Sequence, residues 1–128
     1  MDTERGQPTI VVVDDEAPIV EVVCDVLSDA DITAVGCTHG RDAYPCILEH
    51  HPQAVILDVQ MPDVDGITLF QQLRADPSTS ELPVIFFTAN SHMLKQRLPD
   101  YRDQGATLLP KPFDLDRLLT EVERALTP

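Results

Sequence analysis

A chain of 128 residues that is 43% hydrophobic and 24% charged has the size and composition of one globular domain. Its 22 acidic and 9 basic residues give a formal net charge of −13, which disfavours direct binding to nucleic acid or to an anionic membrane surface. No apolar run reaches the ~18 residues of a membrane span, and the polar start is unlike a signal peptide, so we expect a cytoplasmic protein.

Short apolar runs and longer helical patterns alternate along the chain. After a loose lead-in over residues 1–8, runs typical of buried strands fall at 9–13, 32–37, 54–58, 82–87 and 106–109. The second run alternates more weakly and belongs near a sheet edge. Apolar residues at helical spacing predict helices over 17–29, 40–50, 67–76, 115–126 and part of 91–104. The alternation predicts an α/β fold, with a parallel sheet covered by helices on both faces.

Two prolines fall inside predicted helices. Pro45 should kink the helix over 40–50 or mark its real start, and Pro99 interrupts the segment 91–104. Gly105 closes that segment as a C-terminal cap would, and Asp114 is placed to cap the last helix.

Polar residues end four of the predicted strands. Asp14 and Asp15 follow the first strand, and Asp58 ends the third. Thr88 follows the fourth strand and Lys111 the fifth. A lone Asp at such a place is usually a helix cap or turn former. Right-handed crossovers bring the carboxyl ends of parallel strands to one edge, however, so we expect all five residues to converge there.

The converging residue types favour phosphoryl transfer. Three carboxylates in one pocket repel each other unless a cation joins them, and Mg²⁺ suits a site with a few oxygen ligands. A divalent ion and a lysine would neutralise phosphoryl oxygens, while a free carboxylate attacks phosphorus in line.

Other motifs are weak or absent. The three cysteines have no CxxC spacing, and we interpret them as small buried hydrophobic residues in a reducing compartment. Asp63 to Gly66 resembles part of a calcium loop, but Met61 and Gln72 stand at its first and last ligand positions, which excludes an EF-hand. The sequence has no Walker glycine loop, GxGxxG or GxSxG elbow, and its histidines have no metal-site spacing.

The motifs VVVDDE, LDVQMPDVDG, FFTA and PKPF resemble those of the receiver domain of bacterial two-component response regulators. The resemblance covers about residues 9–127 and implies one receiver domain over residues 1–128. It implies a flavodoxin-like (βα)5 fold, with a doubly wound five-stranded parallel sheet in the order 2-1-3-4-5. The implied function is signalling in a phosphorelay. The domain would take a phosphoryl group from a sensor histidine kinase or histidine phosphotransfer protein and relay it to an unknown downstream target. It would not be an enzyme in the turnover sense.

The resemblance also implies roles for the acidic residues. Asp58 would be the phosphoacceptor. Asp15, Asp58 and the main-chain carbonyl of Gln60 would ligate Mg²⁺, and Asp14 would act mainly through water.

Further roles follow at the ends of the fourth and fifth strands. Thr88, Ala89 and Lys111 would bind the phosphoryl oxygens, and the bond from Lys111 to Pro112 would be cis. Thr88 and Leu108 occupy the family's switch positions, but the family usually has an aromatic residue where this chain has Leu108. We therefore predict that the response to phosphorylation is concentrated in the loop after Thr88 and in the segment interrupted by Pro99, with little change at Leu108.

Two alternatives belong to other functional classes. One is an interaction module that works without phosphorylation, which the complete acidic pocket disfavours. The other is a metal-dependent phosphohydrolase with an aspartyl-phosphate intermediate. Such enzymes commonly carry a second acid two residues after the nucleophile, and Gln60 stands at that position here.

Overall fold

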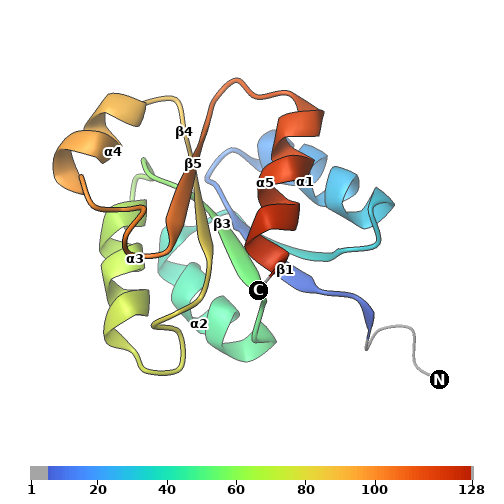
Figure 1. The fold of residues 1–128 in the computed structure, drawn as a ribbon, viewed down its shortest axis with the longest axis horizontal. Helices are drawn as coiled ribbons and strands as arrows, with labels where there is room; N and C mark the ends of the chain where they lie inside the picture. Colours follow the sequence, from blue (N-terminus) through green and yellow to red (C-terminus); the bar gives the residue numbers. More distant parts are fainter. Residues whose placement is uncertain (1–5, 128) are drawn as a thin grey trace.

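Five parallel strands form one sheet in the order β2-β1-β3-β4-β5, as expected (Figure 1). The computed structural model describes residues 6–127, so most of the predicted lead-in lies outside the described residues. The strands are β1 (Thr9–Val13), β2 (Thr33–Cys37), β3 (Ala54–Asp58), β4 (Val84–Thr88) and β5 (Ala106–Pro110). The weakly patterned β2 lies at one edge, and β3, whose residues are all buried, lies at the centre.

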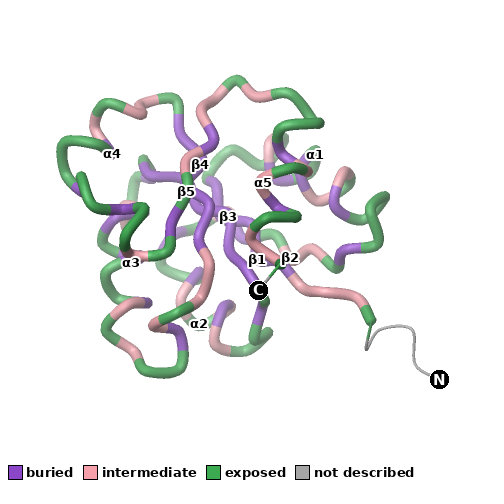
Figure 2. Tube along the Cα trace, viewed as in Figure 1, coloured by how far each residue is buried: buried purple, intermediate pink, exposed green. Residues whose placement is uncertain are grey.

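Helices cover both faces of the sheet. They are α1 (Ala17–Asp29), α2 (Gly40–His50), α3 (Gly66–Ala75), α4 (Ser91–Arg97) and α5 (Leu115–Leu126). Residues of α1 and α5 pack with Ile10 and Ile56 on one face, while α2, α3 and α4 pack with Val11 and Val55 on the other. Successive residues of a strand therefore pack into the cores on opposite faces of the sheet, because side chains alternate across a strand. Figure 2 shows that β1, β3 and β4 are almost entirely buried, whereas the helices, β2 and β5 combine buried with exposed residues.

The start of α2 corrects one expectation. Pro45 lies inside the helix, which already begins at Gly40, so the alternative that Pro45 marks its start is wrong. The reason is a contact from elsewhere in the chain. The Asp63 carboxylate accepts hydrogen bonds from the backbone N–H groups of Gly40 and Arg41, at 3.2 and 3.1 Å. These donors have no partner within the helix, and Asp63 satisfies them from outside.

Helix α4 occupies only the first part of the segment 91–104, which was predicted to be partly helical. It stops at Arg97, with Leu98 as its C-cap, so Pro99 follows the helix instead of interrupting it. Gly105 has a φ of 83° and closes the turns that lead into β5, so it does not cap α4. The predicted cap of the last helix is confirmed, because Asp114 accepts a hydrogen bond from the N–H of Arg117 at 2.7 Å.

Two smaller differences concern a strand boundary and the cysteines. Strand β4 begins at Val84, two residues later than expected, because Leu82 still donates its N–H to a turn carbonyl. Cys37 is buried as predicted, whereas Cys24 and Cys46 are only partly buried.

Among residues 6–127, no helix combines the length and apolar character that a membrane span requires.

Candidate functional site

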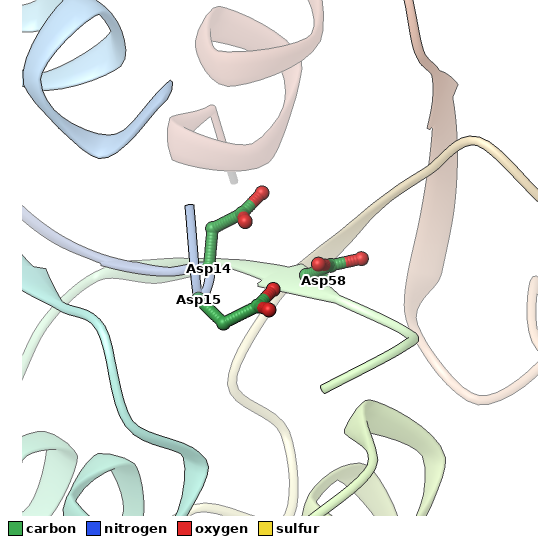
Figure 3. A group of neighbouring side chains, drawn as sticks. All are labelled: Asp14, Asp15 and Asp58. Atoms are coloured by element: carbon green, nitrogen blue, oxygen red, sulfur yellow. The ribbon is translucent and has the colours of Figure 1, made fainter. Parts of the chain in front are cut away.

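The sheet topology brings three carboxylates together at the carboxyl ends of β1 and β3. Val13 and Leu57 are register partners in adjacent strands, so the residues that follow them emerge side by side. Asp14, Asp15 and Asp58 each offer a carboxylate oxygen, and these oxygens all lie within 4.8 Å of one another (Figure 3). The predicted convergence of the acids is therefore confirmed.

The three acids differ in burial and in bonding. Asp14 is fully buried, Asp58 is 4% exposed, and Asp15 is exposed. The N–H of Glu16 donates to Asp14 Oδ1 at 2.9 Å, and the N–H of Gln60 donates to Asp58 Oδ1 at 3.3 Å. These backbone bonds fix the two buried carboxylates, while Asp15 faces solvent.

Lys111 reaches the same pocket from the segment after β5. Its Nζ lies 2.7 Å from Asp14 Oδ2, 3.4 Å from Glu16 Oε1 and 3.5 Å from Asp58 Oδ2. Its backbone N–H donates to the carbonyl of Thr88 at 2.8 Å, which ties this segment to the end of β4. The peptide bond from Lys111 to Pro112 is cis.

The negative charge of the carboxylates in the pocket exceeds the positive charge that Lys111 supplies. Burial and the nearby Asp14 carboxylate raise the pKa of Asp58 from 3.8 to about 7, although Lys111 and the N–H of Gln60 oppose the rise. Burial acts to lower the pKa of Lys111, but its hydrogen bond to Asp14 and the charges of Asp58 and Glu16 leave that pKa raised. One lysine thus does not neutralise the cluster. An all-oxygen donor set with excess negative charge fits a hard divalent cation such as Mg²⁺.

The remaining predicted residues lie at the end of β4 and along β5. Thr88 is 1% exposed, and its Oγ1 accepts a hydrogen bond from the N–H of Asn90 at 2.9 Å. Asn90 in turn caps α4, so Thr88 is linked to the start of that helix. Ala89 and Lys111 line a mainly apolar cleft. Leu108 is partly buried and packs against the core beneath α2, α3 and α4.

Two residues near the site have roles that the sequence pattern did not reveal. Glu16 contacts Lys111, and no sequence motif marks that contact. A Cβ on Gly66 would lie 2.1 Å from the carbonyl oxygen of Asp58, so only glycine lets α3 begin this close to the end of β3. The close approach of two backbones is the physical reason for a glycine here.

Comparison with known proteins identifies the family. The family model of the response regulator receiver domain matches residues 10–123. The chain belongs to this family. Receiver domains are signalling domains of two-component systems, so the predicted class of protein is confirmed.

The relatives are longer regulators. The chain is 35% identical over 119 residues to the response regulator Rre1 of Synechocystis sp., covering 92% of this chain and 51% of that protein. It is 33% identical over 116 residues to the DNA-binding transcriptional regulator NtrC of Salmonella typhimurium, covering 91% and 24%. The chain therefore spans about half of one relative and about a quarter of the other.

Solved structures share the fold over nearly the whole chain. A putative response regulator from Chloroflexus aurantiacus has a TM-score of 0.83 and 30% identity, covering 94% of this chain and 98% of that one. The response regulator TrrA of Thermotoga maritima, solved in complex with Mg²⁺ and BeF, has a TM-score of 0.83 and 26% identity, covering 94% and 100%.

Proposed function

We propose that this receiver domain accepts a phosphoryl group on Asp58, in a step that needs Mg²⁺ and that the domain itself catalyses. The observation that carries the proposal is the grouping of Asp58 with Asp14, Asp15 and Lys111 at one sheet edge. The fold alone would leave the function open, because function depends on the site. The complex of the related TrrA with Mg²⁺ and BeF supports the same chemistry here.

Each residue has a defined part in this proposal. An oxygen of Asp58 forms the new bond to phosphorus while the bond from phosphorus to the donor's imidazole nitrogen breaks, and that nitrogen keeps the electron pair. Asp15, Asp58 and the carbonyl of Gln60 would hold Mg²⁺, with Asp14 acting mainly through water. The ion, when bound, would neutralise charge on the transferring group. Lys111 would do the same from the other side of the pocket.

The end of β4 would hold the remaining oxygens of the phosphoryl group. Thr88 would donate its hydroxyl, and Ala89 its backbone N–H. Because Thr88 Oγ1 now accepts a bond from Asn90 at the start of α4, its rotation would carry the signal into that helix. This linkage supports an output through α4.

The proposed donor is a sensor histidine kinase or a histidine phosphotransfer protein, and the proposed target is another protein. The net charge of −13 makes contact between this domain and DNA unfavourable, although NtrC is named as a DNA-binding regulator. Any DNA binding would then belong to other segments of a longer protein.

The test is phosphorylation by acetyl phosphate with Mg²⁺, followed by mass spectrometry. We expect one base-labile phosphoryl group per chain, lost in Asp58→Asn and retained in the control Asp29→Asn, which alters an exposed residue at the end of α1. Omission of Mg²⁺ should prevent labelling. Labelling that persists in Asp58→Asn would disprove the assignment, and steady release of phosphate from simple esters would favour a phosphohydrolase instead.

A further inference from the structure

Lys111 is bound mainly to residues other than the proposed phosphoacceptor. Its Nζ donates hydrogen bonds to Asp14 Oδ2 at 2.7 Å and to Glu16 Oε1 at 3.4 Å, whereas the nearest oxygen of Asp58 is 3.5 Å away. A lysine ammonium has only three N–H donors. Asp14 and Glu16 occupy two of these donors, so only one remains for Asp58 or for a phosphoryl oxygen attached to it.

Glu16 makes the contact that is easiest to release. The side chain of Asp14 is fully buried, while that of Glu16 is 60% exposed, and the Glu16 contact is also the longer one. An exposed ion pair is screened by water and is weak, whereas a buried carboxylate that loses its partner is costly. Glu16 is thus the partner that Lys111 can release at the lowest cost in free energy.

The backbone of Glu16 explains why its side chain is available. Glu16 is the N-cap residue of α1, and its carbonyl accepts from Ile19 and Val20 at 3.0 and 3.2 Å. Its N–H donates to Asp14, so the backbone is fixed on both sides. Its carboxylate makes no capping bond to its own helix and reaches Lys111, 95 positions along the chain.

We propose that Glu16 is a positioning residue that holds Lys111 away from Asp58 and so slows phosphorylation of the domain. Release of Glu16 frees one donor of Lys111 for the incoming phosphoryl group. Loss of the contact therefore speeds the reaction. This inference rests on the proposed phosphorylation of Asp58.

Three variants separate the contact from charge in general. Glu16→Gln removes the charge, and Glu16→Asp keeps the charge but shortens a side chain that already contacts Lys111 at 3.4 Å. Glu21→Gln is the control, because Glu21 is an exposed acid of the same helix α1. With acetyl phosphate at saturating Mg²⁺ and low ionic strength, both Glu16 variants should react about two- to fivefold faster, the range of an exposed ion pair. The control should match the wild type.

Two further measurements test whether Glu16 acts through Lys111. In a Lys111→Met background, Glu16→Gln should no longer change the rate, since a double-mutant cycle isolates the contact. Independently of phosphorylation, an amine-acylating reagent with peptide mapping compares Lys111 with the exposed Lys95, the other lysine of the chain. The ratio of Lys111 to Lys95 labelling should rise about two- to fivefold in both Glu16 variants.

The outcomes separate the two proposals. An unchanged labelling ratio in both Glu16 variants would overturn the positioning role, and so would a wild-type rate in Glu16→Asp or a Glu16→Gln effect that survives Lys111→Met. If the labelling ratio rises while the wild type takes up no phosphoryl group, the positioning of Lys111 by Glu16 is supported. Only the proposed phosphorylation of Asp58 is then disproved.

Discussion

Replacement of Asp58 by Asn should stabilise the protein at alkaline pH when no divalent metal is present. The pKa of Asp58 is raised from 3.8 to about 7, chiefly by burial and then by Asp14. A raised pKa in the folded state means that this carboxyl contributes stability below pH 3.8, and that the contribution is lost as the pH rises through about 7. Asn cannot ionise, so the variant avoids this loss.

The size of the effect follows from the shift. A difference of roughly three pKa units corresponds to about 4 kcal/mol at 1.36 kcal/mol per unit, which is an upper limit because the ionised pocket can relax. We expect Asp58→Asn to raise the free energy of unfolding by about 2–4 kcal/mol at pH 8, and by less than half as much at pH 5. Mg²⁺ should remove most of this difference, because saturation to about 100 times its dissociation constant stabilises the wild type by about 2.7 kcal/mol.

Urea unfolding in EDTA at pH 8 and pH 5, repeated with Mg²⁺, measures these differences. The control Asp29→Asn changes an exposed carboxylate and should stay within about 0.5 kcal/mol of the wild type at both pH values. If Asp58→Asn is no more stable than the wild type at pH 8 in EDTA, the reasoning is refuted. That result would mean that ionisation of the buried Asp58 carboxylate does not lower the free energy of unfolding.

Three other perturbations test other parts of the site. Asp15→Ala should lose most of the stabilisation by Mg²⁺ in thermal melts, and an unchanged response would exclude Asp15 as a ligand. Gly66→Ala should destabilise the fold by about 3 kcal/mol or more in urea unfolding, because its Cβ would lie 2.1 Å from the Asp58 carbonyl oxygen. With beryllofluoride, NMR shifts should concentrate after Thr88 and in α4, because Leu108 has no ring to turn inward. Large shifts along residues 106–109 with a stable dimer would contradict this last expectation.

Local sequence signals were enough to predict the layered fold and the three carboxylates and the lysine that meet at one edge of the sheet. Runs of β-branched and apolar residues marked all five strands within two residues. The signal was clearest for β1, β3 and β4, because a strand buried on both faces tolerates few polar side chains. The polar residues at the ends of four of these strands then marked the site. Parallel strands with right-handed crossovers can only place those ends along one edge.

Tertiary structure decided what depends on partners far apart in the sequence. Helix α2 begins before Pro45 because Asp63 caps it from another loop. The guanidinium of Arg74 donates to the carbonyls of Thr79, Leu82 and Gln104, and no spacing in the sequence predicts these three hydrogen bonds. The contact between Lys111 and Glu16 likewise joins residues that lie far apart in the sequence. Periodicity and turn chemistry report on neighbours along the chain, whereas these contacts exist only once the sheet has brought separate loops together.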